Sequence, residues 1–246
     1  MKQYVFVIII GLLLFFIPFF WLKSGEMNLG GDSGRLYFYD PAAYINLGLY
    51  NYVESGNGSE VVNYVYLPYA TILFLLKRIF QSPTILIAFF NGFTLSVAFF
   101  SIYLIVKELL KGVKNTIRLW YIESASILAG LFYILSQLSI YSGWERPILT
   151  FNQVFLNPFM AFLLLKFILE QKIRYLILAL FTTFIFAPNF SLIGAPSFFA
   201  FYPITLLFLL LYAKFIRGVS LSFRIFDIGI GLFLLIHASH LVNEVE

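Results

Sequence analysis

The stretch Tyr64–Phe80, YVYLPYATILFLLKRIF, decides the predicted membrane topology of the chain. Its uncharged run ends after 13 residues, because Lys77 and Arg78 follow Leu76. A helix needs about 20 apolar residues to cross a bilayer core of about 30 Å, so this run fits a helix lying in the membrane interface better than a span. If it crossed, the basic cluster between 107 and 118 would lie outside, against the positive-inside tendency. We therefore expect a half-buried helix on the outer face.

The composition around this stretch is that of an integral membrane protein. Of the 246 residues, 61% are hydrophobic and 11% are charged, whereas soluble domains average about 45–50% apolar and about 25% charged residues. So few charges cannot cover a water-exposed surface of this size. The net charge of +4 comes from basic residues at the ends of the apolar segments, so it does not indicate a nucleic-acid partner. The absence of cysteine from the sequence excludes disulfides and thiolate metal sites.

Seven apolar segments are expected to be transmembrane helices, with the amino terminus inside. The first has 19 residues without a charge and is expected to be a retained signal-anchor rather than a cleaved signal peptide. Because successive spans cross the membrane in opposite directions, 11 of the 16 Lys and Arg residues lie on the inner side, as the positive-inside tendency requires. The expected spans are Tyr4–Leu22, Pro83–Val106, Ser124–Tyr141, Gln153–Leu169, Tyr175–Ala187, Phe198–Ala213 and Ile225–His240.

These spans predict an all-α, polytopic bundle in the cytoplasmic (inner) membrane. Residues 23–82 form a large first outer loop, which we expect to carry one or two interfacial helices, one of them within Pro41–Glu54. We treat residues 1–246 as a single transmembrane module. It is either a complete enzyme or the amino-terminal part of a longer one.

A polar stretch at the start of this outer loop, Asn28–Pro41, carries the residues with the clearest chemical potential. Asp32 and Arg35 lie among three glycines, and Asp40 follows five residues later. Charged groups held beside a membrane indicate function by default. The alternative is a solvated loop whose glycines only turn the chain.

The residue types in this loop suit transfer of a sugar from a lipid-linked phosphate donor. A carboxylate can act as general base on an acceptor hydroxyl, and an arginine can bind a phosphate through paired hydrogen bonds. Asp32 is the preferred base, since the neighbouring glycines leave its carboxylate approachable. The alternative for Arg35 is that it only pairs with Asp32 or Asp40. The candidate residues are Asp32 and Asp40 for catalysis, Arg35 and Arg146 for the donor phosphate, and Glu145, Asn63, Tyr66 and Asn189 as further site residues.

No metal site and no bound cofactor are predicted from these residues. His237 and His240 share one helix face and could bind a metal, but two histidines without a third ligand fit an interfacial role better. A divalent cation is left as an open alternative. The sequence also lacks a P-loop motif, which argues against an ATPase.

The order of these elements resembles the amino-terminal module of GT-C membrane glycosyltransferases. A first span, an acidic outer loop with amphipathic helices and a multi-span bundle follow one another in both. The nearest similarity is to the α-(1→3)-arabinofuranosyltransferases of bacterial cell-wall arabinan. Their loop reads roughly D-T-K-x-D-L, then an N/D-P pair, then an aromatic entry to a proline. Three segments of this sequence correspond to these elements in order: Asp32-Ser-Gly-Arg35, Asp40-Pro41 and Asn63-Tyr-Val-Tyr-Leu-Pro68. Further on, Leu135-Ser136 resembles the Leu-Ser-Pro motif of the family, with Gln137 in place of the proline.

The resemblance implies an enzyme that uses a polyprenyl-phosphate sugar as donor and a glycan or lipid as acceptor, outside the cytoplasmic membrane. It implies that Asp32 is the catalytic base. The second aspartate of the family motif has no counterpart, because Tyr37 or Tyr39 falls near its position. Two other classes stay open from the sequence: a transporter or flippase for lipid-linked substrates, and a non-catalytic membrane scaffold.

Overall fold

The computed structural model describes residues 2–21, 36–49, 67–111, 119–136, 153–186 and 196–219. Every regular element in these ranges is a helix, so the prediction of an all-α fold is confirmed for the described part of the chain. The helices are α1 (Lys2–Phe16), α2 (Pro18–Trp21), α3 (Leu36–Tyr39), α4 (Pro41–Gly48), α5 (Leu67–Phe80), α6 (Pro83–Lys111), α7 (Leu119–Ile134), α9 (Gln153–Glu170), α10 (Ile173–Ile185) and α11 (Pro196–Phe215). The last expected span, Ile225–His240, lies outside the described residues.

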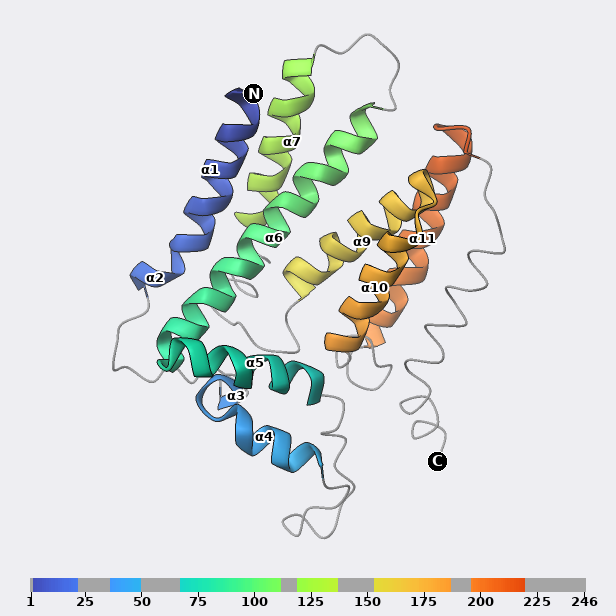
Figure 1. Cartoon of the computed structure of the whole chain (residues 1–246). Helices are drawn as coiled ribbons and strands as arrows, with labels where there is room; N and C mark the ends of the chain where they lie inside the picture. Colours follow the sequence, from blue (N-terminus) through green and yellow to red (C-terminus); the bar gives the residue numbers. More distant parts are fainter. Residues whose placement is uncertain are drawn as a thin grey trace.

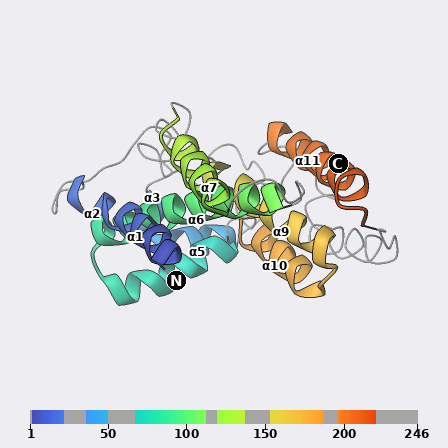
Figure 2. The same ribbon diagram turned by 90° about the horizontal axis from the view of Figure 1, so that it is seen from above.

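The long helices run in alternate directions between two ends of the molecule (Figure 1). Helix α6 is the centre of the bundle and packs against α1, α7 and α9, and α9 in turn packs against α10 and α11. The same grouping is visible from above (Figure 2). Helix α5 does not continue the alternation. It lies across the lower end of the bundle with α3 and α4 beside it (Figure 1), and we call these three helices the cross layer.

Residues 23–82, which the sequence analysis expects to be the first outer loop, thus contain helices, and three of them are described in place of the one or two expected. Helix α3 is a single turn that the sequence analysis did not anticipate. Helix α4 begins at Pro41, as expected for Pro41–Glu54, and α5 ends at Phe80 after its basic pair.

One described helix, α6, is long and apolar enough to cross a bilayer core by length and composition alone. Neighbouring helices bury 67% of its most apolar window. Four other apolar helical segments are shorter, namely Val5–Phe20, Leu119–Ile134, Ile173–Ile185 and Ile204–Phe215.

Glycines let the first helix approach α6 closely. A Cβ atom added to Gly92 would lie 2.0 Å from the backbone oxygen of Phe15, and one added to Gly11 would lie 2.2 Å from the Phe100 ring. The Ser96 hydroxyl donates to the Gly11 carbonyl oxygen at 2.8 Å. Small residues at a helix contact allow the backbones to come together, which gains van der Waals contacts and interhelical hydrogen bonds.

A buried ion pair joins α6 to α7. The Lys107 ammonium, on a residue only 7% exposed, donates to the Glu123 carboxylate and to the Tyr103 hydroxyl, the latter at 2.8 Å. The Tyr103 hydroxyl donates to the second carboxylate oxygen at 2.6 Å. The three groups satisfy one another, which is the condition under which a charge pair is tolerated inside a protein.

Candidate functional site

Of the sequence-predicted site residues, Asp40 is the one that the structure describes. It lies in the cross layer, between α3 and α4. The other candidates lie outside the described residues and stay predictions: Asp32, Arg35, Asn63, Tyr66, Glu145, Arg146 and Asn189.

Asp40 is the N-cap residue of α4. Its Oδ1 accepts a hydrogen bond from the backbone N–H of Ala43 at 3.1 Å, and the residue is exposed. Aspartate is among the best N-caps because it satisfies an N–H that has no partner within the helix, and proline is favoured at the next position. The Asp40-Pro41 pair therefore starts a helix, whatever further role its carboxylate has.

Lys77 joins α5 to the end of α3 through a hydrogen bond. Its ammonium group donates to the backbone carbonyl oxygen of Tyr39, 38 residues earlier in the sequence. That carbonyl is in the last turn of α3, where backbone oxygens have no partner within the helix. Lys77 thus holds the cross layer together, a role that the sequence did not reveal.

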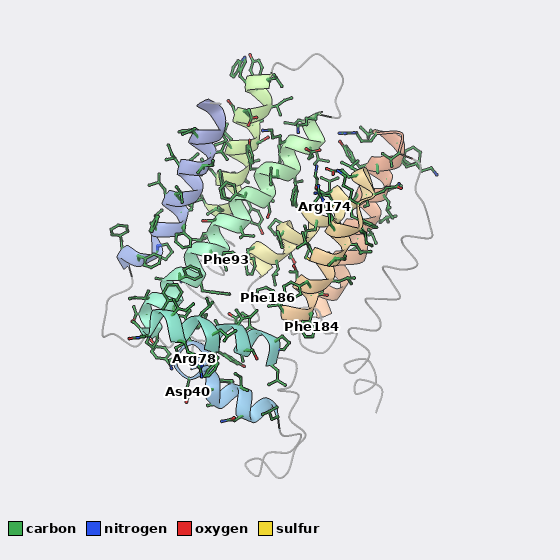
Figure 3. All side chains as sticks on the ribbon, in the orientation of Figure 1. Asp40, Arg78, Phe93, Arg174, Phe184 and Phe186 are labelled. Carbon is green, nitrogen blue, oxygen red and sulfur yellow. The ribbon has the colours of Figure 1, made fainter. Side chains whose placement is uncertain are left out.

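Arg78 differs from its neighbour, because it is exposed. Its guanidinium carbon lies 4.6 Å from the centroid of the Phe74 ring, a cation–π contact within α5. The labelled side chains of Asp40 and Arg78 occupy the same end of the molecule (Figure 3). An exposed carboxylate and an exposed guanidinium are therefore available at the cross layer.

Two tyrosines stack on either side of the Asp40 turn. The ring centroids of Tyr37 and Tyr44 are 3.7 Å apart, with 29° between the ring planes. Burial, and secondly the negative charge of Asp40, raise the pKa of Tyr44 above its usual value. The Tyr44 hydroxyl therefore stays protonated at neutral pH and available as a hydrogen-bond donor beside Asp40.

A cluster of aromatic rings supports the cross layer from the bundle side. The Tyr69 ring of α5 lies 5.7 Å from Phe90 of α6 and 5.6 Å from Phe186, the C-cap residue that follows α10. Phe38 of α3 and Phe155 of α9 extend the cluster, at 5.4 Å from Phe90 and from Phe186 respectively. Edge-to-face and tilted pairs of this kind add specific geometry to ordinary burial. Aromatic rings from five helices or their flanking residues thus pack together beneath the exposed site.

The described residues offer no cluster of three or more His, Asp or Glu side chains that could hold a metal ion. Besides Asp40, the structure brings Lys77, Arg78, Tyr37 and Tyr44 to the cross layer. In the sequence, the basic pair at the end of α5 marked only the end of the uncharged run. The tyrosine pair was not recognised, although its spacing on either side of an Asp-Pro helix start could have indicated it.

No family model matches this sequence, and no curated protein or solved structure is similar enough to it to count as a match. The likeness to GT-C enzymes therefore rests on the short motifs of the first outer loop and on the order of the helices.

Proposed function

We propose that the protein is a multi-pass membrane glycosyltransferase of GT-C type, with seven spans and the amino terminus inside. It transfers a sugar from a polyprenyl-phosphate donor to a glycan or lipid acceptor at the outer face of the cytoplasmic membrane. The observation that carries the proposal is the cross layer. It interrupts the bundle between the first helix and α6, where GT-C enzymes have their acidic outer loop.

The exposed apolar surface supports the membrane placement. On α10 and α11, large side chains such as Ile177, Phe181, Leu207 and Phe208 are each more than half exposed. Water-soluble monomers rarely expose contiguous apolar patches of more than a few hundred Å². An apolar solvent around the bundle removes this cost, whereas water around it does not.

The short helices fit a bilayer through local adjustment. Helix α10 has 13 residues, or about 20 Å at 1.5 Å per residue, against a hydrocarbon core of about 30 Å. Thinning of the bilayer and polar groups reaching the interface accommodate such a mismatch at a modest cost. Helix α6, with 29 residues, has length to spare and can tilt.

The cross layer supports a reaction at one end of the bundle. Asp40 and Arg78 are exposed there, and the Tyr44 hydroxyl lies beside the Asp40 turn. In the proposed reaction the acceptor hydroxyl oxygen attacks the anomeric carbon, the bond from that carbon to the phosphate oxygen breaks, and polyprenyl phosphate leaves. Asp32 takes the acceptor proton as general base. Arg35 and Arg146, with Arg78 as an addition, bind the donor phosphate.

The direct test is transfer from labelled polyprenyl-phosphate sugars by the purified full chain. We expect Asp32→Asn to reduce turnover by about 100-fold or more, the usual contribution of a positioned base. Glu26→Gln removes a carboxylate from the same loop and serves as the matched control, with turnover unchanged. Full activity in Asp32→Asn removes Asp32 as the base. Movement of the donor across vesicles without transfer would assign the protein to the transport class instead.

A further inference from the structure

The end of the bundle opposite to the cross layer carries a connected network of charged side chains. Glu108 of α6 and Glu170 of α9 are its two carboxylates, and Lys166 of α9 bridges them, donating to Glu170 and lying 3.8 Å from Glu108. Lys111 lies 2.9 Å from Glu108. At the α9–α10 turn, Lys172 and Arg174 approach Glu170 at 2.8 Å and 3.8 Å.

Helix α11 joins this network through the end of α6. Arg217 donates to the backbone oxygen of Glu108 at 3.2 Å, and the Tyr212 hydroxyl donates to the backbone oxygen of Leu109 at 3.1 Å. These oxygens belong to the last turn of α6, where carbonyls need outside partners and cations are favoured. Four helices therefore meet at this end through polar groups.

The network has more positive than negative charge. Five cations, Lys111, Lys166, Lys172, Arg174 and Arg217, surround two carboxylates, Glu108 and Glu170, so the described cluster has a net charge of 5 − 2 = +3. The excess is exposed at the α9–α10 turn, since the side chains of Lys172 and Arg174 are 56% and 63% exposed. Glu170, their shared partner, can neutralise at most one of the two.

Apolar side chains continue directly from these cations along the helix. Ile173 and Ile177 of α10 are both about half exposed, and Phe181 follows one turn further on. Arg174 is toward the same upper end of α10 (Figure 3). An exposed basic pair above an exposed apolar strip matches a molecule with an anionic head and hydrocarbon chains. A free anion would contact only the basic pair and not the apolar strip.

We propose that the α9–α10 turn binds the phosphodiester headgroup of an anionic phospholipid through Lys172 and Arg174, with the acyl chains along Ile173, Ile177 and Phe181. The proposal rests on the membrane placement proposed above, but not on the transfer reaction. The site lies at the other end of the bundle from the cross layer. Loss of lipid binding and loss of turnover can therefore be measured separately.

The test is a titration of the purified full chain, in neutral detergent micelles, with phosphatidylglycerol and with phosphatidylcholine. Bound lipid is counted by native mass spectrometry. We expect phosphatidylglycerol to bind the more tightly. Each basic residue near an anionic lipid surface contributes an amount equivalent to about fivefold in affinity, so Arg174→Gln should weaken binding about fivefold and Lys172→Gln/Arg174→Gln roughly 30-fold.

Lys214→Gln is the matched control. The Lys214 ammonium is exposed and lies 5.6 Å from the centroid of the Phe215 ring, as Arg174 lies 4.8 Å from that of Tyr175, but Lys214 belongs to α11 and not to the α9–α10 turn. Affinity for phosphatidylglycerol should be unchanged in this variant. Thermal unfolding in lipid-free detergent checks that each variant is folded, and raising the salt from 0.1 M to about 1 M should reduce the preference for the anionic lipid.

Three results would overturn the proposal. The first is equal affinity for the two lipids, and the second is equal weakening by Arg174→Gln and Lys214→Gln. The third is displacement of phosphatidylglycerol by millimolar inorganic phosphate in the wild-type protein, which would identify the ligand as a free anion. A protein that fails these tests and still transfers sugar leaves the enzymatic proposal intact.

Discussion

Removal of either charge from the Lys107–Glu123 pair would leave the other charge without its counter-charge in a largely buried position. The Lys107 and Glu123 side chains are 9% and 13% exposed, and Tyr103 is 3% exposed. Each carboxylate oxygen and the ammonium group has a partner within the trio. An uncompensated charge at such a position is far costlier than a well-packed apolar group.

We therefore predict that Glu123→Leu destabilises the protein by about 3–5 kcal/mol, because Lys107 is left buried without its counter-charge. The triple variant Tyr103→Phe/Lys107→Met/Glu123→Leu should recover most of this loss, since no polar group is then stranded. Chemical unfolding of the three proteins in the same detergent measures both values. A triple variant no more stable than the single one would show that the trio contributes net stability beyond mutual satisfaction.

Gly92 is the second sensitive residue, because its α-carbon faces main chain and not a movable side chain. A Cβ atom there would lie 2.0 Å from the Phe15 oxygen and 2.8 Å from the Phe15 carbonyl carbon. We predict that Gly92→Leu costs about 3 kcal/mol or more by separating α1 from α6. Ala125→Leu enlarges an exposed position on α7 and should change stability by less than about 0.5 kcal/mol. Similar unfolding midpoints for both variants would contradict the close contact.

At the scale of elements, helix α4 depends on its first residue. Asp40→Ala should cost about 1 kcal/mol of local stability, because the Ala43 N–H loses its acceptor, whereas Asp40→Asn keeps an equally good cap. Hydrogen exchange across 41–49 measures the difference. The asparagine variant also separates two roles for Asp40. A folded α4 with reduced transfer assigns the carboxylate to the reaction, and a folded α4 with full transfer limits Asp40 to capping.

Glu170, at the turn between α9 and α10, makes the free energy of unfolding depend on pH in the acidic range. Hydrogen bonds from Lys166 and then Lys172 lower the pKa of Glu170 from 4.5 to about 2. A folded-state pKa below the unfolded value means that the stabilisation is present above about pH 4.5 and is lost as the pH falls through about 2. We predict that unfolding midpoints of the wild type fall over this window more steeply than those of Glu170→Gln. Parallel pH profiles would show that Glu170 does not contribute.

Local patterns in the sequence predicted most helices to within a few residues, but α7 runs from Leu119 to Ile134 where Ser124–Tyr141 was expected. Contacts between distant segments were not predicted. Asp40-Pro41 and Pro83 placed the starts of α4 and α6 correctly, since both signals act on adjacent residues. The expected span ended at Val106, before the basic cluster that begins at Lys107, whereas α6 continues for five more residues to Lys111. Lys107 is neutralised by Glu123, 16 residues later.

The candidate site was predictable only in part for the same reason. The Asp-Pro signal marked Asp40 as special, and its capping role follows from that signal alone. The contact from Lys77 to the Tyr39 carbonyl spans 38 residues, and no periodicity encodes it. The first expected span, Tyr4–Leu22, is helical in its described part but is divided at Ile17, which no apolar pattern indicated. Helix α1 ends at Phe16 and α2 begins at Pro18, where a proline lacks the N–H that would continue the ladder.

At the scale of the whole molecule, the two ends of the bundle have different chemistry. The lower end has the cross layer with Asp40 and Arg78 (Figure 3). The upper end, where α6 and α9 end (Figure 1), has the charge network around Glu108 and Glu170. The proposed orientation puts the basic upper end inside, in agreement with the positive-inside tendency. The same orientation exposes the cross layer to acceptors outside.

This orientation predicts opposite labelling of the two ends. The chain has no cysteine, so each introduced thiol is the only reactive one. Asn46 and Lys214 are exposed. Asn46 belongs to α4 at the lower end, and Lys214 is the second-last residue of α11, which ends at the upper end (Figure 1). In intact cells, a membrane-impermeant maleimide should label Asn46→Cys and not Lys214→Cys, and permeabilisation should make both reactive. Labelling of both variants in intact cells would place the two ends on one side, which is incompatible with helices that cross the bilayer. Labelling of Lys214→Cys alone would reverse the orientation and move the cross layer away from an acceptor outside the cell.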